Sequence, residues 1–196
     1  MHVVLTHNVC VSTDYIRLND NFLTGTIPSF FGKMSPVELW LSKNQMSGTI
    51  PSELAMMKRL QTLRLNKMNL SGTIPEELFN LSNLVILDVS KSNLSGSLSA
   101  EIAKLEDLAV LVVNGNELSG EIPTSMGEMG LEVMLMHGNH FIGEVPQSVC
   151  DRKGPTGLKE LAVDCLPSVS DGRVRVSCDC CDVCCDYESG VCHNVE

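Results

Sequence analysis

One spacing constrains this 196-residue chain more than any other feature, because a glycine returns every 23 or 24 residues along most of it. The glycines are Gly25, Gly48, Gly72, Gly96, Gly120 and Gly143. Around each one the same frame recurs, with apolar residues nine and seven positions before the glycine and Ile, Leu or Val two positions after it. A fixed period of this length predicts a solenoid in which each repeat forms one coil.

The apolar pair that starts each repeat predicts a short β-strand, because alternate residues of a strand face the same side. The first members of the six pairs are Ile16, Leu39, Leu63, Leu87, Leu111 and Met134. Leu158, Leu161 and Val163 start a seventh, incomplete repeat. Stacked strands form a parallel sheet, and since no repeat can bury its apolar edge alone, both ends of the array need caps.

Asparagine is expected five residues after the first apolar residue, where its amide can bond backbone groups of adjoining coils. Four repeats have it, as Asn21, Asn44, Asn116 and Asn139. Met68 and Ser92 stand at this position in the third and fourth repeats. We therefore expect the asparagine ladder to weaken in the middle, where packing or water must satisfy the backbone.

Residues 15–149 resemble the plant-specific class of leucine-rich repeats, whose pattern is L-x-x-L-x-L-x-x-N-x-L-S/T-G-x-I-P; Thr24-Gly25-Thr26-Ile27-Pro28 is one match. The resemblance implies an α/β solenoid, a right-handed superhelix with a parallel concave sheet and short 3-10 or helical returns on the convex side. Repeats of this class serve receptor-kinase ectodomains, secreted inhibitors of cell-wall enzymes and adhesion proteins. The resemblance is more specific for fold than for function.

We divide the chain into an N-terminal segment, residues 1–14, six repeats, residues 15–149, and a partial seventh repeat with a cysteine-rich cap, residues 150–196. The first segment leaves no room for a usual capping unit, and Met1–Thr13 lacks a basic stretch followed by an apolar core. We expect a truncated N-terminus whose signal peptide is missing. No apolar run approaches the roughly 20 residues that cross a bilayer.

The outward residues of the strands form a grid on the concave face, which is the default binding surface of a solenoid. Those predicted to contact a ligand are Tyr15, Arg17, Glu38, Trp40, Arg64, Asp88, Val112, Leu135 and His137. Trp40 is the only tryptophan and falls between Arg17 and Arg64 of adjacent coils. Tyrosine, tryptophan and arginine are enriched at interface hot spots. The alternative is that the arginine side chains only shield an exposed indole.

Two further arrays lie on the coils. The outward residues of the later repeats are apolar, namely Ile86, Val110, Val112, Val133 and Leu135. They predict a surface for a protein partner or a second copy of the chain, unless the cap covers them. A hydroxyl column after each glycine, Thr26, Thr49, Thr73 and Ser97, is of a kind that binds ice or polysaccharide, but repeats also copy such residues for packing.

Eight of the nine cysteines lie in the last repeat and the cap, as Cys150, Cys165, Cys178, Cys180, Cys181, Cys184, Cys185 and Cys192. In an oxidising compartment they predict a disulfide-stapled cap with open connectivity. The alternative is a zinc or copper(I) site, because the Cys-x-Cys-Cys-x-x-Cys-Cys run brings thiolates close together. We expect no metal and no other cofactor. The cap also resembles those of secreted or surface proteins from diatoms and related algae.

Three Asn-x-Ser sequons, at Asn69, Asn80 and Asn93, are candidates for glycosylation in the secretory pathway. Together with the cysteines they predict an extracellular or cell-surface protein. The net charge of −10 and the isoelectric point near 4.9 argue against nucleic acid as a partner.

Nothing in the sequence indicates an enzyme. No catalytic signature surrounds any of the five histidines, and His137 has no Ser, Cys or carboxylate at a matching column. Asp88 and Asp164 belong to different coils, and no glycine-rich phosphate loop is present. We therefore predict a non-enzymatic recognition module, a receptor-like ectodomain or secreted protein, that binds a protein or peptide on its concave face. The alternative is an adhesive or inhibitor protein that binds cell-wall polysaccharide.

Overall fold

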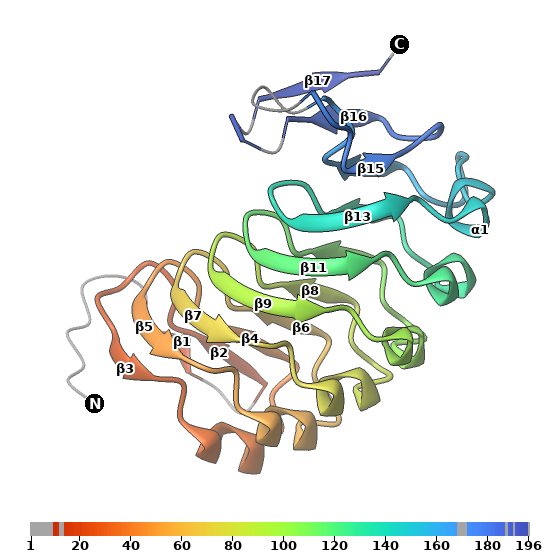
Figure 1. Cartoon of the computed structure of the whole chain (residues 1–196). Coiled ribbons are helices and arrows are strands. Elements are labelled where there is room, and N and C mark those ends of the chain that lie inside the picture. Colours follow the sequence, from red (N-terminus) through yellow and green to blue (C-terminus); the bar gives the residue numbers. More distant parts are fainter. Residues whose placement is uncertain (1–9, 12–13, 168–171, 187, 190, 196) are drawn as a thin grey trace.

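The computed structural model describes residues 10–11, 14–167, 172–186, 188–189 and 191–195, so most of the predicted N-terminal segment lies outside the described residues. The chain forms a curved stack of coils (Figure 1). Each of the six repeats contributes one strand to a long sheet, one strand to a second sheet and one helical turn. The predicted α/β solenoid with a parallel concave sheet is confirmed.

Ten strands within the described residues form the long sheet on the concave side. In spatial order they are β1 (Cys10–Val11), β2 (Tyr15–Arg17), β4 (Glu38–Trp40), β6 (Thr62–Arg64), β8 (Ile86–Asp88), β10 (Val110–Val112), β12 (Val133–Leu135), β14 (Glu160–Val163), β16 (Val183–Cys185) and β17 (Cys192–Asn194). The strands from β2 to β16 are parallel. β1 and β17 are antiparallel to their neighbours, so a reversed strand lies at each end.

The second sheet runs beside the first along the stack (Figure 1). Its strands are β3 (Thr24–Thr26), β5 (Gln45–Gly48), β7 (Asn69–Gly72), β9 (Asn93–Ser97), β11 (Glu117–Glu121), β13 (His140–Glu144) and β15 (Val176–Ser177). Short turns follow, namely η1 (Ser29–Lys33), η2 (Ser52–Met56), η3 (Glu76–Asn80), η4 (Ala100–Lys104), η5 (Thr124–Glu128) and α1 (Gln147–Cys150). None of these described helices is long and apolar enough to cross a membrane.

The repeated glycine is required by both conformation and space. Gly48 and Gly96 have φ of +83° and +84°, a left-handed backbone that strains other residues. A Cβ on Gly48 would lie 3.0 Å from the methyl carbon of Thr26, and one on Gly96 would lie 2.9 Å from that of Thr73. The hydroxyl column therefore packs its methyl groups onto the glycines of the next coil, which gives it a structural role.

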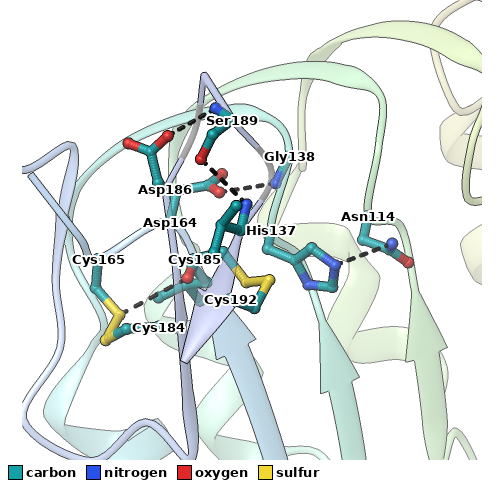
Figure 2. Close-up of a disulfide and its surroundings, with 12 residues drawn as sticks. Asn114, His137, Gly138, Asp164, Cys165, Cys184, Cys185, Asp186, Ser189 and Cys192 are labelled. Atoms are coloured by element: carbon teal, nitrogen blue, oxygen red, sulfur yellow. Dashed lines mark hydrogen bonds between the residues drawn. A yellow bond between two sulfur atoms is a disulfide. The ribbon is translucent and has the colours of Figure 1, made fainter. Parts of the chain in front are cut away.

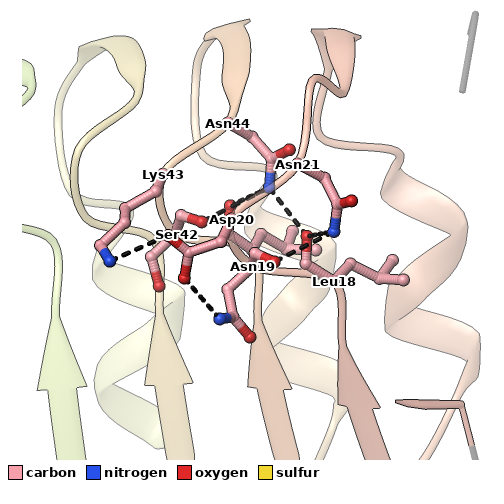
Figure 3. Close-up of polar contacts among 8 residues, drawn as sticks. Leu18, Asn19, Asp20, Asn21, Ser42, Lys43 and Asn44 are labelled. Atoms are coloured by element: carbon pink, nitrogen blue, oxygen red, sulfur yellow. Dashed lines mark hydrogen bonds and ion pairs between the residues drawn. The ribbon is translucent and has the colours of Figure 1, made fainter. Parts of the chain in front are cut away.

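The asparagine ladder is present where the sequence predicts it. Its four members, Asn21, Asn44, Asn116 and Asn139, are at most 7% exposed. The Asn44 amide donates to the Leu18 carbonyl of the preceding coil at 2.9 Å (Figure 3). It also donates to the Leu41 carbonyl of its own coil at 2.8 Å, and its Oδ1 accepts from the Leu23 N–H at 2.9 Å. Asn116 and Asn139 likewise reach the Val89 and Val113 carbonyls, so these three asparagines fasten their coils to the preceding ones. In the first coil, Asn21 donates to the Leu18 and Asn19 carbonyls of its own coil.

The ladder is interrupted at the two predicted positions. Met68 is 4% exposed and packs in the core, whereas Ser92 is buried and its hydroxyl has no hydrogen-bond partner. The hydroxyl of Ser92 is too short to make the bonds that Asn44 and Asn116 make one coil away from the gap. A buried polar group without a partner lowers stability by about 1–3 kcal/mol.

We expect Ser92→Asn to stabilise the protein, because the amide supplies the missing bonds between the third and fourth coils. Each new bond contributes about 1 kcal/mol, so the melting temperature should rise by about 2–5 °C. Thermal unfolding followed by circular dichroism measures the change. Met68→Asn is the matched control and should lower the melting temperature, since it removes buried apolar surface; a loss of stability in Ser92→Asn would contradict this account of the gap.

A second ladder follows the strands of the long sheet, where each coil passes through a residue with a left-handed backbone. This left-handed column consists of Asp20, Lys43, Lys67, Lys91, Gly115 and Gly138, with φ between 53° and 68°. The N–H groups of the first five each donate to a main-chain carbonyl of the next coil at 2.8–3.0 Å. The N–H groups of Gly138 and Asn139 donate instead to the Asp164 carboxylate, at 2.8 and 3.0 Å. The Asp164 carboxylate thus takes the place of the main-chain carbonyl that accepts these bonds in the earlier coils.

The cap continues the solenoid. β14 and β15 extend both sheets beyond the sixth repeat, so the seventh repeat, predicted to be incomplete, has a strand in each sheet. Asp182 accepts from the Leu161 N–H at 2.7 Å and pairs with Lys153, which fastens the cap to this coil. The division of the chain at residue 149 stays a prediction.

The predicted disulfide-stapled cap is confirmed by four disulfides. They join Cys150 to Cys180, Cys165 to Cys184, Cys178 to Cys181 and Cys185 to Cys192. The first one connects α1 to the cap, and the last one closes the reversed hairpin of β16 and β17. A paired sulfur is no thiolate, so the cysteine cluster in this state does not offer the ligands that a zinc or copper(I) site needs.

Candidate ligand-binding face

The strand register brings the predicted grid together on the exposed side of the long sheet. Its central column runs through Arg17, Trp40, Arg64, Asp88, Val112 and Leu135, each paired directly with the next. Tyr15 and Glu38 pair in the adjoining column, and His137 follows β12 by two residues. The intervening residues Leu39 and Leu63 are fully buried, so the grid residues face outward.

Two guanidinium groups enclose the Trp40 indole. The ζ-carbon of Arg17 lies 4.5 Å from the ring centroid, and that of Arg64 lies 4.7 Å from it. Because the two arginines belong to the coils on either side, they cover opposite faces of the ring. This geometry matches the alternative in which the arginine side chains shield the indole. The polar groups that the stack presents are then the two guanidinium groups.

The two guanidinium groups differ in their partners. Arg17 donates through Nε to Glu38 at 2.8 Å and pairs with the same oxygen through Nη2 at 2.6 Å. Arg64 has no hydrogen bond or ion pair with any described residue, and its Nε is buried without an acceptor. The neighbouring Asp88 carboxylate accepts instead from the Ser90 N–H and hydroxyl. The Nη groups of Arg64 are therefore the donors left for a ligand, since the buried Nε is out of a ligand's reach.

The apolar part of the grid forms one continuous patch. Ile86, Val110 and Val133 are paired in one column, and Val112 and Leu135 are paired in the next. All five side chains are half-buried, so the cap leaves part of the patch accessible. Beyond β12 the same columns continue with Glu160 and Ala162 of β14. The apolar patch ends at these two residues.

His137 lies where the cap meets the concave face (Figure 2). Its Nε2 is 3.2 Å from the amide nitrogen of Asn114, and its Nδ1 is buried without a hydrogen-bond partner. The ring and the sulfurs of Cys185 and Cys192 come within 4.8 Å of one another. The expectation that His137 has no Ser, Cys or carboxylate at a matching column is therefore wrong, because the cap folds back onto this column and brings Cys185 and Cys192 to the ring. These sulfurs are joined as a disulfide and are neither nucleophiles nor thiolate ligands.

Burial perturbs two titratable groups here. Desolvation lowers the pKa of His137 below its ordinary value, so the ring is neutral at neutral pH. Burial raises the pKa of Asp164, and the hydrogen bonds from the Gly138 and Asn139 N–H groups oppose this shift only in part. The charge of His137 is thus disfavoured at the boundary between cap and grid.

We expect the stability of the protein to fall as the pH drops below about 6.5, the ordinary pKa of histidine. The unfolded chain binds the proton that folded His137 resists, so protonation favours unfolding. His137→Gln should be less sensitive between about pH 6.5 and 5. Urea unfolding of both proteins at several pH values measures the difference in their free energies of unfolding. Because Asp164 is present in both proteins, this difference reports on His137. A difference that does not change with pH would contradict the assignment.

The left-handed column is the feature that the sequence analysis missed. Three consecutive repeats place a lysine there, Lys43, Lys67 and Lys91, at the edge of the grid. The signal was present in the sequence, since each lysine directly precedes the ladder position.

Comparison with known proteins agrees with the repeat architecture. A family model for the leucine-rich repeat matches residues 12–34, 35–57 and 59–81. No curated protein sequence matches the chain. Many solved structures match its fold.

Three of these structures are plant receptor ectodomains from Arabidopsis thaliana. The ectodomain of the receptor kinase GASSHO1/SCHENGEN3, in complex with CASPARIAN STRIP INTEGRITY FACTOR 2, is 30% identical with a TM-score of 0.68, over 86% of this chain and 25% of that one. The HAESA ectodomain with an IDA peptide hormone is 27% identical with a TM-score of 0.71, over 92% and 31%. The SOBIR1 ectodomain is 35% identical with a TM-score of 0.61, over 65% and 72%. The chain thus spans about a quarter to a third of the first two.

Proposed function

Because this chain is a leucine-rich-repeat protein, we propose that it is a non-enzymatic recognition module, a receptor-like ectodomain or secreted protein, that binds a peptide or protein on its concave face. The stack of Arg17, Trp40 and Arg64 carries the proposal. It presents oriented hydrogen-bond donors on β2, β4 and β6, in the N-terminal part of a face whose other residues are held in register by the sheet.

The stack lowers the cost of binding. Arginine loses much side-chain entropy when a partner fixes it, but the Trp40 indole already holds the Arg64 guanidinium in place. The unpaired donors of Arg64 match the acceptor geometry of carboxylates and main-chain carbonyls. The proposed contacts remain Tyr15, Arg17, Glu38, Trp40, Arg64, Asp88, Val112, Leu135 and His137.

A peptide or protein fits this face better than a polysaccharide does. The GASSHO1/SCHENGEN3 and HAESA ectodomains have a protein factor and a peptide hormone as their partners. Sugar rings are often held on an open aromatic face, whereas both faces of Trp40 are covered by guanidinium groups. The aliphatic patch beside the stack suits apolar side chains.

We expect Arg64→Gln and Trp40→Leu to weaken capture of peptides selected on the wild-type protein from a phage library of random dodecapeptides. The first change removes the Arg64 guanidinium, and the second removes the Trp40 indole on which this guanidinium stacks, so affinity should fall about tenfold or more. The free energy of unfolding should change by less than about 1 kcal/mol, because these residues face outward. Biolayer interferometry measures the affinities and urea unfolding measures the stabilities.

Lys104→Gln in turn η4 is the charge-matched control, and its affinity should stay within about twofold of wild type, since it lies off the concave face. Selected peptides that bind the Arg64→Gln and Trp40→Leu proteins as tightly as wild type would refute the proposed site. Failure to select any peptide, with binding on a carbohydrate array that survives both changes, would favour the polysaccharide alternative.

We further propose an extracellular or cell-surface location. Four disulfides persist only in an oxidising compartment, and the asparagines of the three sequons are exposed. The resemblance of the cap to secreted or surface proteins of diatoms and related algae supports the same location.

Expression through a eukaryotic secretory pathway, behind an added signal peptide, should yield a protein glycosylated at Asn69, Asn80 and Asn93, since all three acceptors are accessible. Each Asn→Gln change should remove one glycan from the intact mass. Asn83→Gln, at an exposed asparagine outside a sequon, should remove none. A secreted protein of unmodified mass would overturn the glycosylation assignment.

A further inference from the structure

The left-handed column carries positive charge in three adjacent coils. Lys43, Lys67 and Lys91 have φ of 55°, 56° and 53°, and their side chains are exposed. Adjacent strands lie roughly 4.8 Å apart, so the three backbones form a closely spaced row at the edge of the concave face. The column stacks directly, because a Cβ on Gly115 would lie 3.5 Å from the Cα of Lys91.

Lysine is not the residue that the backbone itself favours there. A left-handed backbone costs an L-residue other than glycine, asparagine or aspartate about 1 kcal/mol. The later coils of this chain meet the same requirement with Gly115 and Gly138. Strained positions of this kind gather at functional sites, where another role outweighs the local cost.

Two of the three ammonium groups are without a counter-ion among the described residues. Lys43 pairs with Asp20 at 2.8 Å (Figure 3), whereas Lys67 and Lys91 make no ion pair or side-chain hydrogen bond. Arg64, three residues before Lys67, is also unpaired. The nearby carboxylates are Asp20 and Asp88, and both already accept hydrogen bonds. In a chain of net charge −10, this edge is a local cationic site.

We propose that Lys67 and Lys91, with Arg64, bind the carboxylates of an acidic peptide segment whose aliphatic side chains cover the patch formed by Ile86, Val110, Val112, Val133 and Leu135. The inference rests on the proposed function and specifies the ligand. A polyuronate supplies carboxylates but leaves the aliphatic patch uncovered, so a peptide accounts for both surfaces.

The geometry also sets a spacing for the ligand. Arg64 and Val112 share a column two coils apart, and Lys67 lies three residues beyond Arg64, after the end of β6. At roughly 4.8 Å per coil and at most about 3.3 Å per residue, the Cα atoms of Lys67 and Val112 are at most about 14 Å apart. An extended peptide covers this distance with about four residues. Acidic residues should therefore precede or follow the aliphatic ones within about this interval.

The test uses the full chain and the random dodecapeptide phage library. Peptides selected on the wild-type protein should be enriched in Asp or Glu within about four residues of Val, Leu or Ile. The double variant Lys67→Asn, Lys91→Asn should bind the selected peptides about tenfold more weakly, because asparagine tolerates the left-handed backbone but carries no charge. Raising the salt concentration should weaken the wild-type complex much more than the variant complex.

Two further variants separate charge from folding. Lys67→Gly, Lys91→Gly copies the residues of the later coils, so it should fold at least as stably as the asparagine variant and lose the same affinity. Lys33→Gln, Lys58→Gln removes two charges from the side of the helical turns and should leave binding within about twofold.

The outcomes distinguish this inference from the proposed function. Selected peptides that lose binding in Arg64→Gln but lack acidic residues and bind the lysine variants as wild type would overturn the inference alone. No selected peptide at all would overturn both. Binding of polygalacturonate that is lost in the lysine variants, without enrichment of acidic peptides, would overturn the inference in favour of an anionic polysaccharide.

Discussion

Each coil of this protein depends on its two neighbours for its backbone hydrogen bonds. The N–H groups of the left-handed column from Asp20 to Gly115 find their acceptors one coil further along the stack, whereas the first N–H groups of the strands, such as that of Glu38, donate to the preceding coil. A coil that folded alone would leave them unpaired, so structure propagates from neighbour to neighbour. The end of the array meets the same need with side chains, as Asp164 accepts from Gly138 and Asn139 and Asp182 accepts from Leu161. The disulfides hold the cap that supplies Asp182.

The same dependence organises the candidate binding face. Because the register is fixed, one outward residue from each coil stands beside its counterpart, and a chemical property repeated in sequence becomes a continuous column in space. The stack of Arg17, Trp40 and Arg64 requires three coils in register. The lysine row also requires three coils, two of which it shares with the stack. A surface built in this way offers different chemistry to different segments of one extended ligand, without any deep pocket.

Much of the fold was predictable from the sequence, since the glycine period, the apolar pairs and the asparagine positions all reflect contacts that every coil repeats. The gap at Met68 and Ser92 could be located for the same reason. Features that depend on a single contact could not be predicted. The disulfide pairing and the approach of Cys185 to His137 follow from the path of the cap, which has no period. The guanidinium positions over Trp40 depend on rotamers. The left-handed column differs from these features because it recurs in six coils, but its lysines, such as Lys67, carry neither an apolar nor a glycine signal.

The reversed strands at the two ends of the long sheet have a consequence for assembly. A stack of parallel strands presents unpaired N–H and C=O groups at its ends, and a second solenoid with the same strand direction could add there and extend into a filament. β1 and β17 run against that direction and occupy these edges. At the C-terminal end, the bond between Cys185 and Cys192 keeps β17 in place. End-to-end polymerisation through parallel strand pairing, a hazard for any repeat protein with open edges, is thereby opposed by the first and last of the described strands.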